Sequence, residues 1–190
     1  MSINRKENLM KKLTISGLAL VLLLVSGTAW AGGQSGLYLG GSVGSASFDV
    51  SDGNVQYKDD TNAYKIFGGY NFGVIPLINL AIEGSYVDFG TAKEDVAGSS
   101  AETSVTGWDL FGLAGVNMGP FSLFGKVGAI RWDGKSSYSS QSGNDSGTDP
   151  AYGLGLQLQI SSIAIRAEYE LFTLDKVDIG FASAGVSYTF

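Results

Sequence analysis

Five charged side chains recur at matching places in extended, otherwise uncharged segments, namely Lys65, Glu83, Lys126, Arg166 and Glu168. In a strand, alternate side chains point to opposite faces, so each charge faces one side while its apolar neighbours face the other. Cations and carboxylates that share one buried face can form ion pairs. We therefore expect these five residues, with Glu170 as a further member, to form a network inside the fold.

The same residue types exclude most catalytic chemistry. The chain has no histidine and no cysteine, which excludes a Ser–His–acid or Cys–His nucleophile and makes a zinc site unexpected. A glycosidase with two carboxylates stays formally open through Glu83, Glu168 and Glu170. The acidic stretch 49–54 lacks the ligand spacing of a calcium loop. We expect no enzyme, cofactor or metal, and the net charge of −6 argues against nucleic acid.

The N-terminal segment has the pattern of an export signal. Arg5, Lys6, Lys11 and Lys12 precede the apolar stretch 13–25, and Ala29-Trp30-Ala31 supplies small residues at a cleavage site. We predict a signal peptide over 1–31, cleaved after export through the general secretory route, and one domain over 32–190. A permanent membrane helix is the alternative, but polar and small residues interrupt the stretch.

The remaining sequence predicts an all-β fold. No stretch has sustained helical periodicity, and alternation predicts eight strands separated by links that are long and short in turn. Three links are tight, at 73–76, 118–120 and 161–162, whereas those at 49–61, 88–103, 133–150 and 173–177 are longer, with a flexible loop expected over Ser136–Gly147. The predicted strands are Gly36–Phe48, Asn62–Phe72, Leu77–Val87, Ser104–Asn117, Phe121–Trp132, Ala151–Ile160, Ile163–Phe172 and Asp178–Phe190.

The two faces of these strands differ in charge. One face is apolar, with aromatic residues toward its ends and Arg131 as its one charge, and the other carries the five charges above together with Ser and Gln. An apolar outer face and a polar interior are typical of an eight-stranded antiparallel up-and-down transmembrane β-barrel. A soluble barrel with its apolar face inward is the alternative. A lipid-facing Lys or Arg at mid-depth would cost about 2–4 kcal/mol, and this pattern avoids one.

Five motifs resemble the barrel of the OmpA-like outer-membrane proteins: 37–44, 64–70, 80–86, 165–169 and the last strand, 185–190. The resemblance implies an outer-membrane location, a buried pair between Glu83 and Arg166, and an assembly signal at Tyr188 and Phe190 that the barrel assembly machinery reads. Leu113 and Gln157 stand where the family commonly has a second Lys–Glu pair. Because the chain ends with the barrel, no peptidoglycan-binding domain is expected.

Three roles fit such a barrel. We expect a structural protein, monomeric, that supports envelope integrity in contact with lipid and lipopolysaccharide and presents acidic external loops. The alternatives are a narrow pore for ions or small solutes, and an adhesin or phage receptor. An eight-stranded barrel is just wide enough for its side chains to fill it, which favours the first role over a pore and over a sugar-cleaving site.

Overall fold

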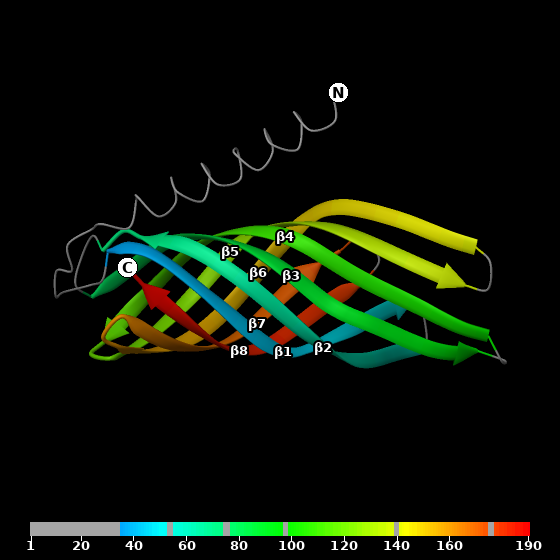
Figure 1. Ribbon diagram of the computed structural model, residues 1–190, viewed down its shortest axis with the longest axis horizontal. Coiled ribbons are helices and arrows are strands. Elements are labelled where there is room, and N and C mark those ends of the chain that lie inside the picture. Colours follow the sequence, from blue (N-terminus) through cyan, green and yellow to red (C-terminus); the bar gives the residue numbers. More distant parts are fainter. Residues whose placement is uncertain (1–34, 53–54, 74–76, 97–98, 139–140, 175–176) are drawn as a thin grey trace, which may run out of the picture.

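A computed structural model describes residues 35–52, 55–73, 77–96, 99–138, 141–174 and 177–190. The predicted signal peptide, 1–31, lies outside these residues. The described chain forms a single closed antiparallel barrel, as predicted, in which each strand pairs with its sequence neighbours (Figure 1). No helix in the described part is long and apolar enough to cross a membrane. The strands are β1 (Gly36–Asp52), β2 (Val55–Asn71), β3 (Ile78–Val96), β4 (Ser99–Met118), β5 (Phe121–Tyr138), β6 (Gln141–Ile160), β7 (Ile163–Thr173) and β8 (Asp178–Thr189).

The barrel closes between β1 and β8. Their register runs from Tyr38 opposite Thr189 to Asp49 opposite Asp178, and the Phe190 N–H donates to the Leu37 carbonyl at 2.9 Å. Closure satisfies backbone groups that an open sheet would leave unpaired at its edges. It therefore permits the last strand to end on an aromatic residue beside lipid.

The short links are tight turns at the end of the barrel that also carries Phe190. Gly119, between β4 and β5, has φ 66°, and Ser161, between β6 and β7, has φ 56°. Both lie in the left-handed region, which glycine occupies without penalty. The predicted links at 118–120 and 161–162 are thereby confirmed.

The predicted long links are wrong in extent. Strands β1 to β6 continue through most of them, so that β5 and β6 pair from Phe121 opposite Leu158 to Tyr138 opposite Gln141. The described parts of Ser136–Gly147 are strand rather than loop. Ser and Gly have low strand propensity, but the propensity depends strongly on context. Cross-strand hydrogen bonding within each hairpin outweighs it here.

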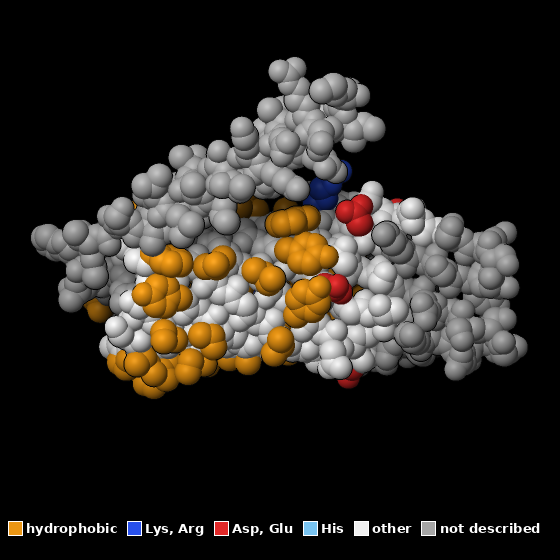
Figure 2. All heavy atoms as spheres, in the orientation of Figure 1, with side chains coloured by type: hydrophobic (Ala, Val, Ile, Leu, Met, Phe, Trp, Pro, Cys, Tyr) orange, Lys and Arg blue, Asp and Glu red, His pale blue; other side chains and the backbone are white. Residues whose placement is uncertain are grey.

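The outward face is apolar over the part of the barrel nearest the short turns. Figure 2 shows hydrophobic side chains covering this part, with acidic and basic side chains only at its far border. Val127 and Leu154 are 60% and 66% exposed, as expected for side chains that contact lipid. Aromatic pairs accompany this surface, such as Tyr86 with Trp108 and Tyr188 with Phe190, whose ring centroids lie 5.2 and 5.0 Å apart. Aromatic girdles of this kind lie at the membrane interfaces.

The interior is not polar throughout, contrary to the sequence prediction. A fully buried apolar layer fills the half of the lumen toward the long hairpins, and Phe89, Phe172 and Phe181 are 0% exposed at its centre. Alternation shows only which side of the sheet a residue faces. Depth along the barrel axis depends on strand register, so the sequence did not separate this layer from the charged residues on the same face.

Candidate functional site: the charged layer of the lumen

The charged residues of the inner face lie together, on the side of the apolar layer that is nearer to the short turns. Lys65 comes from β2, Glu83 from β3 and Lys126 from β5, whereas Arg166 and Glu168 are alternate residues of β7. All five side chains are buried, with exposed fractions from 0% to 7%. The strand alternation that directs them inward also directs their apolar neighbours toward lipid.

Glu83 is the hub of one half of this network. Its Oε2 lies 2.6 Å from Arg166 Nη1 and accepts a hydrogen bond from the Tyr38 hydroxyl at 3.0 Å. Its Oε1 lies 3.4 Å from Lys126 Nζ. One carboxylate therefore contacts two cations and a phenol from three other strands, which restrains the positions of those strands.

The other half is built on Glu168 and Glu170. Arg166 Nε lies 2.7 Å from Glu168 Oε1, and Lys126 Nζ lies 2.8 Å from Glu170 Oε1. Lys126 also contacts Glu168, and Lys65 contacts Glu170, in two further short ion pairs. Three cations thus face three glutamates, so that this group is formally neutral. Such matching is required because a buried charge without a partner costs several kcal/mol.

Aromatic rings line the network. The Arg166 guanidinium lies 4.6 Å from the ring centroid of Phe67 and 4.9 Å from that of Phe124. The Lys126 ammonium lies 4.8 Å from the Phe111 centroid. Cation–π attraction is strongest when the cation is desolvated, so these rings partly replace the water that the cations lose.

Sequence reasoning missed part of the layer. It did not single out Tyr38, whose hydroxyl binds Glu83, or the buried hydrogen bond from Ser85 to Asp109. Glu170, added only as a further member, is 0% exposed and contacts two lysines. Spacing alone could have found Glu170, because it continues the alternation of Arg166 and Glu168. Alternation also places Tyr38 inward, between the outward-facing Leu37 and Leu39. Its hydrogen bond to Glu83 depends on depth along the barrel, which alternation does not report.

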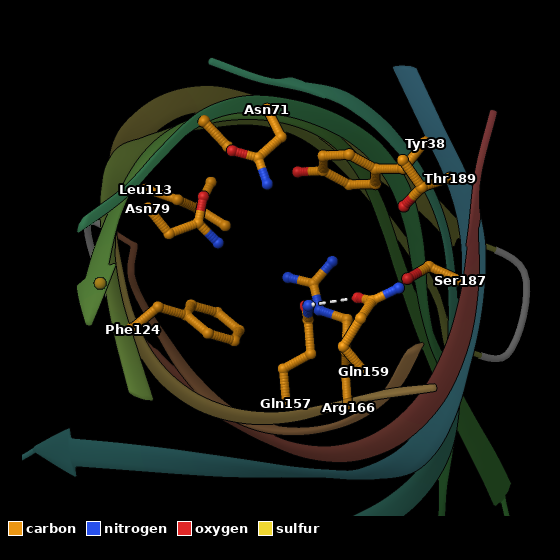
Figure 3. Close-up of a pocket in the computed structure, with 12 residues that line it drawn as sticks. Tyr38, Asn71, Asn79, Leu113, Phe124, Gln157, Gln159, Arg166, Ser187 and Thr189 are labelled. Atoms are coloured by element: carbon orange, nitrogen blue, oxygen red, sulfur yellow. Dashed lines mark hydrogen bonds between the residues drawn. The ribbon is translucent and has the colours of Figure 1, made fainter. Parts of the chain in front are cut away.

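A small cavity lies on the side of the network nearest the short turns. Figure 3 shows Arg166 pointing into it, with Asn71, Asn79 and Gln157 around the wall. The cavity measures about 30 Å³, and one water-sized occupant needs about 10–15 Å³. This cavity therefore has room for very small occupants and none for a sugar. Leu113 and Gln157, at the positions where the resemblance implies a second Lys–Glu pair, both line this cavity.

The predicted assembly signal lies on the outside. Tyr188 and Phe190 are 47% and 43% exposed, on the apolar outward face near the barrel's short turns. They take no part in the lumen network. The described residues also contain no group of three or more side chains suited to hold a metal ion.

Comparison with known proteins identifies the barrel type. A family model described as the outer membrane protein beta-barrel domain matches residues 17–190. The chain belongs to this family. It is therefore an outer-membrane protein, as the OmpA-like resemblance predicts, and its apolar outward face contacts lipid. The soluble-barrel alternative is wrong.

Two curated relatives extend along most of the chain. The attachment invasion locus protein of Yersinia enterocolitica is 27% identical over 95% of this chain and 99% of its own length. The 22 kDa outer membrane protein of Rhizobium leguminosarum bv. viciae is 26% identical over 83% of this chain and 72% of its own length. Both are similar to this outer-membrane barrel along most of their lengths.

Solved structures show the same fold. Ail, the attachment invasion locus protein of Yersinia pestis, solved in complex with the heparin analogue sucrose octasulfate, gives a TM-score of 0.59 at 24% identity over 83% of this chain and 100% of its own. Neisserial surface protein A gives 0.59 at 14% identity, over 82% of this chain and 98% of its own. At these identities the likeness shows the barrel fold alone.

Proposed function

We propose that this protein is a closed structural barrel of the outer membrane, without enzymatic activity, that presents acidic hairpins outside the cell. The observation that carries the proposal is the filled lumen. An ion that crosses the barrel would meet the charged layer and then the apolar layer, where Phe89, Phe172 and Phe181 are 0% exposed. Moving an unpaired ion into such surroundings is very costly.

Conductance of the refolded protein in planar bilayers tests the proposal against the pore alternative. We expect no steady channels from the natural sequence, and open channels only when both layers are cut, as in the triple variant Phe89→Ser, Phe172→Ser, Arg166→Ala. Phe72→Ser, on the exposed outer face, is the matched control and should stay closed. Steady open channels from the unaltered protein would instead favour the pore.

The proposal includes an acidic surface in contact with lipopolysaccharide. Barrels of this class have their short turns in the periplasm, so the long hairpins would lie outside the cell. Most acidic residues of the chain beyond residue 31 lie in or beside these hairpins. Because lipopolysaccharide is also anionic, contact requires divalent cations between the two. Binding of lipopolysaccharide to the refolded barrel should fall when EDTA removes the cations and return with added Mg²⁺. Binding that is insensitive to EDTA would contradict cation bridging.

Attachment to other cells is a second candidate, favoured by the relative named for attachment and invasion and by hairpins that extend beyond the barrel (Figure 1). Lys135 pairs with Asn144 and Gly134 with Asp145, so deletion of 135–144 shortens the β5–β6 hairpin without changing its register. The deletion removes no acidic residue. If the deletion abolishes cell binding and the double variant Asp133→Asn, Asp145→Asn retains it, the hairpin itself is recognised. If the double variant abolishes binding and the deletion retains it, the acidic charge is recognised.

We also propose Tyr188 and Phe190 as the signal read by the assembly machinery. The Phe190 side chain is partly exposed and lies outside the lumen network. Phe190→Ser should therefore reduce insertion in cells while refolding in detergent stays close to normal. An equal defect in both assays would indicate a role in stability instead.

A further inference from the structure

The cavity beside Arg166 has the chemistry of an anion site. Arg166 is 3% exposed, and its Nη1 and Nε face Glu83 and Glu168. Its Nη2 is buried and has no hydrogen-bond partner among the described residues. The remaining donor of a buried guanidinium is thus left for an occupant of the cavity that Arg166 lines.

Two neutral donors point into the same space. In Figure 3 the amide nitrogens of Asn71 and Asn79 point toward the middle of the cavity, as the guanidinium does. The Asn71 Oδ1 faces the backbone N–H of Gly73 at 3.5 Å, which directs the amide nitrogen away from that turn. The buried atoms of the described cavity wall without a hydrogen-bond partner include Arg166 Nη2, a donor, and Asn79 Oδ1, an acceptor. A buried guanidinium donor of this kind requires an acceptor.

The cavity wall contains no carboxylate. Its residues are aromatic, apolar, amide-bearing or hydroxyl-bearing apart from Arg166. The glutamates of the network contact Arg166 through its other nitrogens, and Gln157 donates to Gln159 at 2.9 Å. A cation would therefore meet amide and hydroxyl oxygens and the positive charge of Arg166 but no carboxylate, whereas an anion would meet a guanidinium and two amide groups.

We propose that this cavity binds a small monovalent anion of the halide class, with Arg166, Asn71 and Asn79 as its donors. The volume of about 30 Å³ suits a monatomic ion, which is only slightly larger than water, better than a phosphate or sulfate. Because the apolar layer closes the other half of the lumen, the ion enters and leaves at the end with the short turns. The site is thus a dead end rather than a step in permeation, and an ion that binds only the folded barrel raises its stability by mass action.

Two measurements on the refolded full barrel test the proposal. Crystals grown in bromide should show anomalous scattering within hydrogen-bond distance of Arg166 Nη2. The unfolding midpoint should be higher in sodium chloride than in sodium gluconate at equal ionic strength. The absence of bromide from a well-ordered cavity would overturn the proposal, as would bromide seen in crystals without any chloride effect in solution, which would mean an adventitious ion only.

Variants separate an anion from water. Asn79→Asp puts a carboxylate of similar shape in the wall, so the bromide signal and the chloride effect should both be lost. Ser122→Ala, a buried residue outside the cavity wall, should retain both. A signal that persists in Asn79→Asp would contradict the site. If that variant does not fold, Asn71→Asp replaces it, and the wild-type measurements alone still decide the outcome. None of these results depends on whether the barrel conducts or attaches.

Discussion

The two layers of the lumen exclude water in different ways. In the apolar layer, rings pack edge to face, with Phe89 and Phe172 centroids 5.1 Å apart. In the charged layer, six buried ionisable side chains fill the lumen, and each of them contacts partners from other strands. Packing energy is shared among many weak contacts, whereas a buried ion pair fails when either partner is lost. We therefore expect the charged layer to specify the arrangement of the strands, and the apolar layer to tolerate small changes.

Removing one carboxylate should have the largest effect. Glu83→Ala leaves Arg166 and Lys126 with a partner fewer in a buried site, and we expect a loss of about 3–5 kcal/mol in the free energy of unfolding. Urea titration of the barrel in lipid vesicles measures it. Ser122→Ala, which removes a single buried hydroxyl bonded to Asn117, is the control and should cost about 1 kcal/mol. An equal loss of unfolding free energy in both variants would show that the ion pairs contribute no more to stability than a single buried hydroxyl.

A charge placed on the lipid-facing side of the same strand should lower the free energy of unfolding slightly less than Glu83→Ala does. Val127 follows Lys126 directly but faces lipid, and Val127→Lys should destabilise the barrel by about 2–4 kcal/mol if it lies at mid-depth. Met118→Lys, at the exposed end of β4 beside a short turn, should cost about 0–1 kcal/mol by the same rule. The same vesicle titration compares them. A harmless lysine at position 127 would contradict the assignment of that face to lipid.

Trimming the apolar layer should have the smallest effect. Ile130 is 0% exposed, and Ile130→Val removes one methylene, for which we expect a loss of about 0.5–1.5 kcal/mol. Because the surrounding rings can shift, the cost should fall well below that of Glu83→Ala. A loss as large as that of the carboxylate would mean that the apolar layer is as intolerant of change as the ionic one.

The sequence predicted most of the barrel because polar and apolar side chains alternate in every strand. Strand number, order and inward side follow from residues such as Lys126 and Val127, whose neighbouring side chains differ in character. Strand ends did not follow, because Ser- and Gly-rich segments pair through their backbones, which side-chain pattern does not report. The division of the lumen into layers did not follow either. It depends on register, which sets Glu83 level with Arg166 and Phe89 level with Phe172.

The pairing of β1 with β8 constrains the order of assembly. Contacts such as Gly41 with Val186 join segments from opposite ends of the barrel sequence, and contacts of such long sequence separation form slowly. Until they form, both strands keep an open edge that can capture a neighbouring chain. A partly synthesised polypeptide therefore cannot complete its hydrogen-bonded cylinder, because closure requires β8, the last strand to be made.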